Sequence, residues 1–413
     1  MAYRSTSCSS PPRRVVVTGA GVITAHGTGW RVNADAFRNG TSSLRPVTLF
    51  DVSRQRVTTA GEVQLPENLP PHHLTARQSS RMERGSRLLI HAASEALRQS
   101  GGSGGPLPCV LGTSAGGMAL GEDFFRHSVG PAFRQRGQAT RAVCYQAQSQ
   151  VGLMQQALGL TGPVTVISNA CASGANAIAH AASLVRRGSA TTVLCGGYDA
   201  LCLLVFAGFD TLKALSPTTA RPFDAHRDGL ALGEGAGMMV VESLASAQAR
   251  GAVILAEIAG TGGGTDLHHL TQPHPEGHAA LASMTAACRM AGLRPHDIDY
   301  LNSHGTGTPL NDAAEACAIQ RWAGEHVRDI RVSSTKGGIG HLLGGAGAVE
   351  AVICLMALRE GFLPPCVGVE TPDPVCCFDL IRQPRQAELR SALTNSFGFG
   401  GSNATLIFRQ PSF

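Results

Sequence analysis

Short apolar runs alternate along this chain with longer segments whose apolar residues recur at helical spacing. The apolar runs predict buried strands at 14–18, 109–112, 164–167, 192–196 and 238–242, then at 254–258, 299–303, 330–333, 392–396 and 404–408. The helical spacing predicts helices at 79–99, 172–187, 278–291, 312–322 and 345–359. Strands that alternate with helices are typical of α/β folds in which helices cover the faces of the sheets.

The same rhythm occurs twice, which predicts two similar halves. We expect a flexible N-terminus at 1–12, a first half at 13–253 and a second half at 254–413. The segment 41–71 is rich in Pro, Thr and Arg and predicts a surface excursion.

Composition narrows the class of protein. Apolar residues make up 43% of the 413 residues, enough for a large core, and the net charge of +5 is too small to indicate a nucleic-acid partner. No apolar stretch reaches the roughly 18–20 residues of a membrane span. The N-terminal segment 1–14 has no apolar core, so it does not predict a signal peptide. The twelve cysteines are irregularly spaced and mostly in apolar surroundings, which predicts reduced thiols in a cytoplasmic protein.

Three short motifs carry the candidate chemistry. Cys171 follows an apolar strand and precedes an Ala-rich helix, where the helix N-terminus favours the thiolate and should lower the thiol pKa from about 8.5. His304 lies in a Gly/Thr turn at a strand end. Lys336 and His341 flank a Gly-rich turn before another helix. A thiol with two imidazoles can hold an acyl group as a thioester while a bond forms beside it.

These motifs resemble those of the β-ketoacyl-[acyl-carrier-protein] synthases, of the elongating Cys-His-His branch. The resemblance extends from about Arg13 to Phe408. Further matches in the same order are Arg81 to Arg84, Gly112 to Gly117, Arg221 to Asp224, Gly229, Gly233 to Ala236, and Asp266 with His269, Thr271 and Pro273. The resemblance implies a thiolase-like fold, with two similar halves in a five-layer αβαβα architecture.

The family implies a role for each central residue. Cys171 would be the acylated nucleophile, and His304 and His341 would stabilise the enolate formed as malonyl-[acyl-carrier protein] loses carbon dioxide. Lys336 would lie beside the histidines with Glu315 as its counter-ion, and Asp312 would orient the turn around His304. The product would be 3-oxoacyl-[acyl-carrier protein], in fatty-acid or polyketide chain elongation.

The resemblance also implies a gate and a pocket. Phe399, flanked by Gly398 and Gly400, would swing to admit the acyl chain, and its N–H would join that of Cys171 as an oxyanion hole. The acyl and pantetheine pocket would include Ala115, His269, Thr271, Thr306 and Thr308.

No cofactor is expected beyond the phosphopantetheine that carries the substrates. The expected partners are an acyl carrier protein and a second subunit, either an identical copy or a chain-length factor. The candidate residues for carrier docking are Arg77, Arg81 and Lys213.

Two features depart from the family pattern. Ala115 stands where relatives often carry a bulkier residue, which predicts a wider or longer acyl pocket. The segment 139–150 is polar rather than rich in Pro and Met, which favours a specialised pathway such as polyketide or polyene assembly.

Three features of the chain are also compatible with other interpretations. Cys366 and Gly368 mimic a second thiolase motif, which would suit a non-decarboxylating thiolase-like acyltransferase. Gly19 and Gly21 begin a dinucleotide-binding fingerprint, but Thr24 occupies its third glycine position. A metal site in the histidine-rich segment 268–278 is conceivable, but its prolines favour a surface loop.

Overall fold

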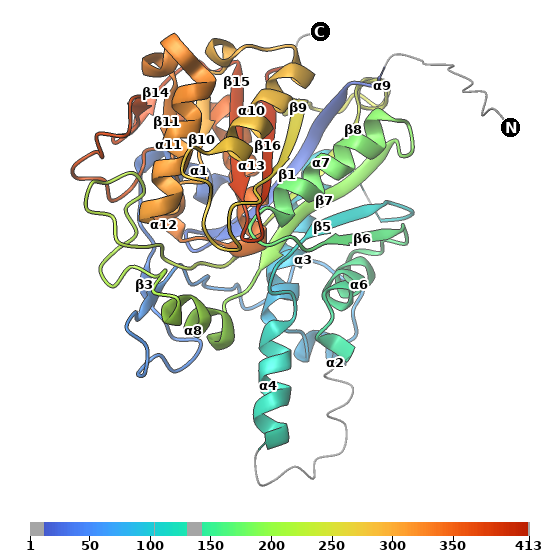
Figure 1. The fold of residues 1–413 in the computed structure, drawn as a ribbon. Coiled ribbons are helices and arrows are strands. Elements are labelled where there is room, and N and C mark those ends of the chain that lie inside the picture. Colours follow the sequence, from blue (N-terminus) through green and yellow to red (C-terminus); the bar gives the residue numbers. More distant parts are fainter. Residues whose placement is uncertain (1–11, 103, 130–142, 412–413) are drawn as a thin grey trace, which may run out of the picture.

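A computed structural model describes residues 12–102, 104–129 and 143–411 (Figure 1). Its main sheet runs in the order β13-β11-β10-β15-β16-β9-β1-β8-β7-β5-β6, with β2 paired to β1. The predicted N-terminal segment 1–12 lies almost wholly outside the described residues, as does the part of the polar segment 139–150 before Val143. The strands of this sheet are β1 (Val15–Thr24), β2 (Gly27–Thr28), β5 (Cys109–Gly112), β6 (Val164–Ile167), β7 (Thr192–Asp199), β8 (Gly235–Ser243), β9 (Ala256–Thr265), β10 (Tyr300–Asn302), β11 (Arg331–Ser333), β13 (Asp379–Leu380), β15 (Ser391–Phe397) and β16 (Ser402–Arg409).

The two halves of this sheet have the same topology. In the first half β1 pairs antiparallel with β8 and β8 with β7, whereas β7, β5 and β6 pair in parallel. In the second half β9, β16 and β15 pair antiparallel, and β15, β10 and β11 pair in parallel. The correspondence places Cys171, after β6, at the position equivalent to the segment after β11 that contains His341.

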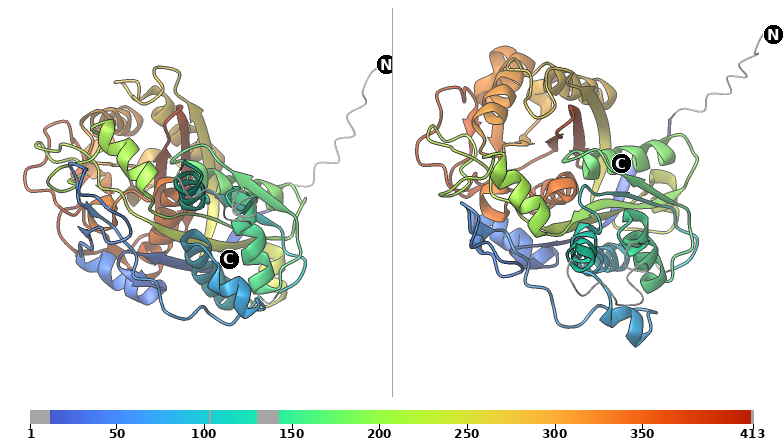
Figure 2. Two further views of the ribbon diagram at one scale, coloured as in Figure 1. Left: turned by 90° about the horizontal axis from the view of Figure 1, so that it is seen from below. Right: turned by 60° about the horizontal axis from the view of Figure 1, so that its bottom comes forward.

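Helices form three layers around the two half-sheets (Figure 2). On one outer side α3 packs on β1 and β8, with α6 beside it; on the other, α10 packs on β9 and β16, with α11 beside it. Between the half-sheets, α7 and α13 contact strands of both and contact each other. This arrangement confirms the predicted five-layer fold. The helices of the layers are α3 (Arg84–Ser100), α6 (Ala147–Leu158), α7 (Ser173–Arg186), α10 (His278–Ala291), α11 (Pro309–Ala323) and α13 (Ala346–Glu360).

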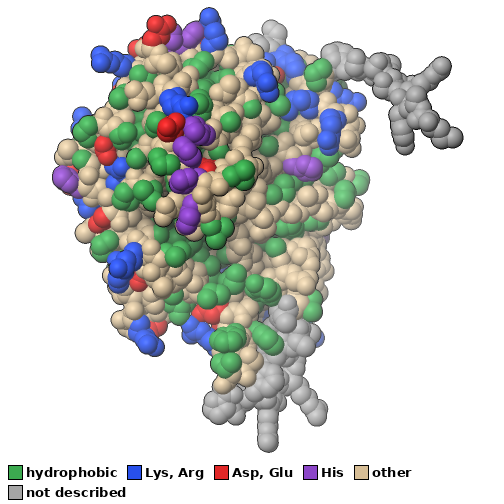
Figure 3. Space-filling view, viewed as in Figure 1, with side chains coloured by type: hydrophobic (Ala, Val, Ile, Leu, Met, Phe, Trp, Pro, Cys, Tyr) green, Lys and Arg blue, Asp and Glu red, His purple; other side chains and the backbone are tan. Residues whose placement is uncertain are grey.

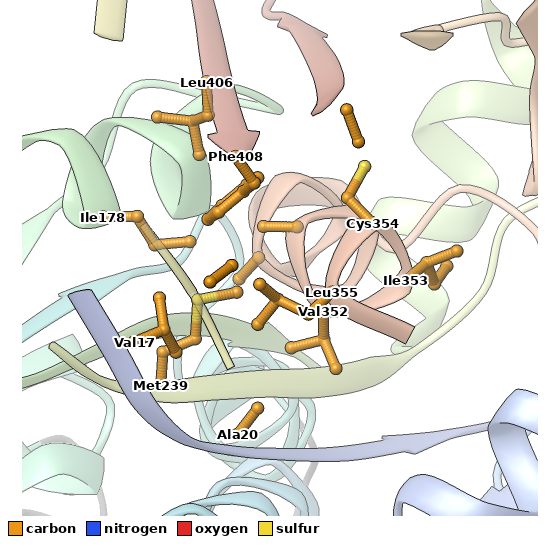
Figure 4. Close-up of a cluster of buried hydrophobic side chains, with 14 of the residues drawn as sticks. Val17, Ala20, Ile178, Met239, Val352, Ile353, Cys354, Leu355, Leu406 and Phe408 are labelled. Carbon is orange, nitrogen blue, oxygen red and sulfur yellow. The ribbon is translucent and has the colours of Figure 1, made fainter. Parts of the chain in front are cut away.

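The largest core cluster lies around the central helices (Figure 4). Val17 from β1, Met239 from β8 and Ile178 from α7 meet Val352 from α13 and Phe408 from β16. All five are fully buried. Burial of a large apolar side chain stabilises the folded state by about 1.5–3 kcal/mol. This cluster therefore stabilises the contact between the two halves.

The first strand is longer than the strand predicted at 14–18. Strand β1 continues to Thr24 through a bulge between Val17 and Gly19. A Cβ on Gly19 would lie 2.1 Å from the Ala96 carbonyl oxygen, and one on Gly21 would lie 2.1 Å from that of Ala92. These glycines allow α3 to approach the strand, so the dinucleotide-binding interpretation was wrong.

The helix predicted at 79–99 is split. A short helix, α2 (Ala76–Ser80), ends before Glu83, which caps α3 by accepting hydrogen bonds from the N–H groups of Gly85 and Ser86. Segment 41–71 is mostly loop, as expected. The remaining elements are α1 (Trp30–Asn39), β3 (Arg45–Pro46), β4 (Thr59–Ala60), α4 (Met118–Val129), α8 (Leu203–Thr211), α9 (Leu244–Ala249), η1 (Pro295–Asp297), η2 (Gly324–Asp329), α12 (Lys336–Ile339), η3 (Leu343–Gly345), β12 (Phe362–Leu363) and β14 (Arg385–Gln386).

Within the ranges described, no helix combines the length and the hydropathy that a membrane crossing requires.

Candidate active site

Cys171 lies in a tight turn between β6 and α7. The preceding residue, Ala170, has φ of 55°, a left-handed conformation that a non-glycine residue adopts only when its surroundings impose it. The Asn169 N–H donates to Ser173 Oγ, and this hydroxyl donates to the Ala170 carbonyl. The turn therefore fixes the position of Cys171, whose side chain is buried. Gly174, in the first turn of α7, lets this helix approach Gly344 and Ala348, because a Cβ there would lie 2.8 Å from the Gly344 carbonyl oxygen.

The environment of Cys171 differs from the expected thiolate-stabilising one. Burial raises the pKa of the thiol to about 12, while the charge of Lys336 and the backbone N–H of Phe399 lower it. Asp199 and Glu350 add smaller raising effects. The expectation of a lowered pKa was wrong, because the effect of desolvation on the thiol exceeds those of Lys336 and the Phe399 N–H.

His304 follows β10 in a turn held by two buried carboxylates. Glu315 accepts hydrogen bonds from the N–H groups of His304 and Gly305, both at 2.8 Å. Asp312 accepts from the N–H groups of Thr306 and Gly307, at 3.0 and 3.1 Å. Both carboxylates lie on α11, so this helix orients the His304 turn, as expected for Asp312.

Glu315 is not the counter-ion of Lys336, as the sequence had suggested. The Lys336 ammonium pairs with Glu350 on α13, and both side chains are almost fully buried. The same ammonium donates to the His304 carbonyl at 2.6 Å and lies 3.5 Å from His304 Nδ1. The two oxygens of Glu315 are occupied by backbone donors of the turn, so they do not reach the ammonium.

The two imidazoles are uncharged. Burial, followed by the nearby charge of Lys336, lowers the pKa of both His304 and His341 well below the usual range. Their rings are edge to face with centroids 5.3 Å apart. The His341 backbone is fixed to the loop before β8, since its N–H donates to the Ala231 carbonyl at 2.7 Å. Two neutral imidazoles at one site can donate N–H groups to a developing oxyanion.

The Phe399 loop covers the thiol. Phe399 is 40% exposed, and its ring stacks on that of Phe209 with centroids 5.8 Å apart. Gly400 has φ of 81°, and a Cβ there would meet no atom within 4 Å. The loop is held at Gly400, whose N–H donates to the Leu270 carbonyl at 2.7 Å.

A cavity of about 390 Å³ connects these groups. Its lining includes Cys171, His304, His341 and Phe399 together with four of the predicted pocket residues, which are His269, Thr271, Thr306 and Thr308. Lys336 lies behind His304 rather than in the lining. Ala115 is also outside it, buried in a separate apolar cluster with Phe206 and Leu343.

The candidate docking residues do not form one patch on the chain. Lys213 lines the cavity. Arg77 lies in α2 and Arg81 ends it, whereas Lys213 follows α8 by two residues. In Figure 1, α2 and α8 lie on opposite sides of α4.

The histidine-rich segment forms a row on the surface (Figure 3). The His274 ring stacks on that of His278 with centroids 4.0 Å apart, and His268 lies 5.1 Å from His274. No group of three metal-binding side chains arranged for an ion occurs among the described residues. Cys366, the residue of the thiolase-like motif, is buried, and its thiol donates to the Pro222 carbonyl at 3.4 Å.

Sequence reasoning missed two buried carboxylates, Glu350 and Asp199. Glu350 had one available signal, because it is a lone acid in the middle of the apolar helix α13. Asp199 ends β7, and its side chain accepts hydrogen bonds from the turn after β5.

The fold and the site define a thiol-dependent acyltransferase of the thiolase-like class. Comparison with known proteins gives the family: residues 12–247 match the N-terminal domain of the β-ketoacyl synthases, and residues 255–370 match the C-terminal domain. The chain therefore belongs to the β-ketoacyl synthase family, whose members join acyl units by Claisen condensation.

Full-length relatives agree with this assignment. The chain is 39% identical to "Nodulation protein E" of Rhizobium meliloti (strain 1021) over 407 residues, which cover 96% of this chain and 99% of the relative. It is 38% identical to "3-oxoacyl-[acyl-carrier-protein] synthase 2" of Synechocystis sp. over 413 residues, with 96% and 98% coverage. The solved structure "The ishigamide ketosynthase/chain length factor" superimposes with a TM-score of 0.90 and 32% identity, covering 97% of this chain and 100% of that one.

Proposed function

We propose that this protein lengthens an acyl chain that is first bound to Cys171 and then condensed with malonyl-[acyl-carrier protein]. The observation that carries the proposal is one cavity containing the Cys171 thiol and two neutral imidazoles, those of His304 and His341. A site with a charged imidazole, or with an acid in place of one imidazole, would suit a reaction other than this condensation.

In the first step the Cys171 sulfur attacks the carbonyl of the acyl-carrier thioester. The carrier thiolate leaves and takes up the proton of the Cys171 thiol. Lys336 and the Phe399 N–H assist by favouring negative charge on the sulfur. The N–H groups of Cys171 and Phe399 would then hold the oxyanion of the tetrahedral intermediate.

In the second step the malonyl group loses carbon dioxide, and the electron pair of the broken C–C bond forms an enolate. His304 and His341 would donate N–H groups to its thioester oxygen. The carbanion attacks the acyl carbonyl, and the Cys171 sulfur leaves as a thiolate that takes up one proton from the solvent. The product, 3-oxoacyl-[acyl-carrier protein], is then released. Lys336, held by Glu350, orients His304 through its carbonyl and Nδ1 atoms.

The direct test is intact-mass measurement of the purified protein after incubation with acyl-carrier proteins of graded chain length. A mass gain of one acyl group, absent from Cys171→Ala and lost on addition of malonyl-carrier protein as 3-oxoacyl product forms, is expected. Absence of any acyl adduct on Cys171 would contradict the proposal.

The carrier protein would approach near Lys213. This residue lines both the cavity and a neighbouring groove, whose other charged residues are Arg54, Arg56, Arg126, Asp51 and Asp210. Arg56 is paired with Asp210 and Arg126 with Glu122, so the positive charge left for an acidic partner comes mainly from Lys213 and Arg54. Lys213→Glu should raise KM for the acyl-carrier protein at least several-fold and leave the use of a small acyl thioester unchanged. A matched control is Arg294→Glu, an exposed arginine in the second half of the chain.

A second ketosynthase-type chain would cover the free edge of the sheet. Strand β6 ends the strand order, its Val164 is 36% exposed, and α4 buries no residue. Exposed apolar residues follow nearby at Val143 and Tyr145. The similar ishigamide protein is described as a ketosynthase with a chain length factor, so the second chain is either an identical copy or such a factor.

The assembly can be tested by measuring the molar mass of the purified protein alone in solution. A dimer that Val164→Lys dissociates, with Val253→Lys on another exposed site as the control, supports the identical copy. A monomer that loads Cys171 but forms no product supports the chain-length factor, and the polyketide-type pathway with it.

A further inference from the structure

A buried carboxylate outside the cavity lining connects the two halves behind the active site. Asp199 ends β7 and is fully buried. Its Oδ1 accepts from Thr113 Oγ1 at 2.5 Å and from the Ala115 N–H at 2.9 Å. Its Oδ2 accepts from the Ser114 N–H at 3.0 Å and, across the halves, from the Gly344 N–H at 2.7 Å.

Gly344 belongs to the segment that follows His341. The residue before it, Leu343, is buried and has φ of 51°, a left-handed conformation that a branched side chain avoids unless it is held there. A Cβ on Gly344 would lie 2.5 Å from the Ser114 nitrogen, so the two backbones are in direct contact. The Asp199–Gly344 hydrogen bond therefore holds a strained turn two residues beyond His341.

The same carboxylate acts on the nucleophile. The charged or titratable groups that influence the Cys171 thiol are Lys336, Asp199 and Glu350, and the two neutral imidazoles share its cavity. Asp199 is one of the groups that raise the thiol pKa, in opposition to Lys336. Burial raises the pKa of Asp199 itself, and the hydrogen bonds from Thr113 and from the N–H groups of Ser114, Ala115 and Gly344 act against this by favouring the carboxylate.

We propose that Asp199 is a positioning residue, which locks the His341–Gly345 segment onto the nucleophile half and thereby sets His341 against Cys171. The inference rests on the proposed function for the role of His341, and it adds a residue outside the three motifs to the machinery. The carboxylate also fixes the turn after β5, which contains Ala115, so one side chain links this turn to the segment of the condensing histidine.

The test is Asp199→Asn in the full chain, which keeps the side-chain shape, removes the charge and turns an N–H toward existing donors. We expect the condensation rate to fall at least 10-fold, while acyl loading of Cys171 falls by less than threefold. Alkylation of Cys171 by iodoacetamide at pH 8, followed on its peptide by mass spectrometry, should become several-fold faster because a negative charge near the sulfur is gone. The control is Asp299→Asn, since Asp299 also accepts backbone N–H groups, from Arg390 and Ser391, away from the cavity.

Equal losses of loading and condensation, with unchanged alkylation, would overturn the proposal and leave Asp199 a purely structural residue. If Asp199→Asn does not fold, Thr113→Val removes one donor to the carboxylate, and Thr113→Ser restores it. Condensation should fall in the first and recover in the second, and no difference between them would equally reject the proposal. Failure of the proposed function itself is distinguishable, because the unaltered protein would then form no product while the alkylation comparison would still report on Asp199.

Discussion

The ammonium of Lys336 and the carboxylate of Glu350 form an ion pair that is 97% or more removed from solvent and lies directly behind His304. The pair joins the turn after β11 to the central helix α13, one of the two helices shared by both halves. A buried charge is tolerated only when it is paired, so each partner depends on the other.

Glu350→Gln should therefore be strongly destabilising. Leaving the Lys336 ammonium without its carboxylate costs about 3–5 kcal/mol of unfolding free energy. Chemical denaturation measures this loss. The control is Glu360→Gln. Glu360 lies on the same helix as Glu350 but forms a more exposed ion pair, with Arg38 of α1, so its loss should change stability by no more than about 1 kcal/mol. Similar losses in both variants would show that the buried pair has no special weight.

Glu315 should give a measurable dependence of stability on pH. Burial raises its pKa from 4.5 to about 7 in the folded protein. Because the folded state holds this proton more tightly, the stabilisation is complete below pH 4.5 and is lost as the pH rises through 7. The difference in unfolding free energy between the unaltered protein and Glu315→Gln should thus fall across this window by up to about 3 kcal/mol. A difference that is constant between pH 4.5 and 7 would contradict the raised pKa.

The two steps of the reaction should respond differently to His341. In the mechanism above, His341 acts on the malonyl thioester, so His341→Ala should slow condensation by about 10²–10³-fold. Loading of Cys171 should change much less. Single-turnover mass spectrometry separates the two rates. If loading fell by the same factor as condensation, the division of roles would be wrong.

The small side chain of Ala115 should set the acyl chain length. It lies outside the Cys171 cavity, in the buried apolar cluster with Phe206 and Leu343, so the prediction requires that the bound acyl chain enters this cluster, where an isoleucine would obstruct it. Ala115→Ile should reduce Cys171 loading by long acyl chains relative to short ones, measured over graded acyl-carrier proteins. Ala115→Gly, which adds no volume, serves as the control, and an unchanged length profile in the isoleucine variant would reject the assignment.

The glycines of β1 provide a test of packing. Gly19→Ala places a methyl group against the Ala96 carbonyl and should destabilise the protein by about 1–3 kcal/mol. Gly152→Ala lies in helix α6, where a Cβ meets nothing within 4 Å, and should be neutral or stabilising by about 0.5–1 kcal/mol. Thermal unfolding compares the two, and equal shifts of Tm would remove the packing explanation for Gly19.

The residues that could be predicted are those whose roles depend on their neighbours in the chain. Cys171 at a strand-to-helix turn and His304 in a Gly/Thr turn have local signatures, and the structure places both in one cavity. The partner of Lys336 could not be found in this way. Glu315 and Glu350 are both acids on helices, and only the tertiary arrangement decides that Glu315 is taken by backbone N–H groups.

The length of strand β1 was predicted wrongly for a related reason. The glycines after Thr18 read locally as a turn, but the close approach of α3 requires them inside β1. The pKa of Cys171 likewise depends on burial and on groups far away in the chain, such as Lys336 and the Phe399 N–H, which no local pattern contains.

Strand β1 pairs with β8 of the first half and, at Val16 and Val17, with β9 of the second. Separating the halves after residue 253 would therefore open this short pairing and, above all, expose the apolar faces of α7 and α13 that each half buries against the other. The fragments should aggregate or recombine rather than fold alone, and the intact chain should unfold in a single cooperative transition. The two similar halves thus depend on each other for their stability. Because the catalytic site is made from both, it forms only when they fold together.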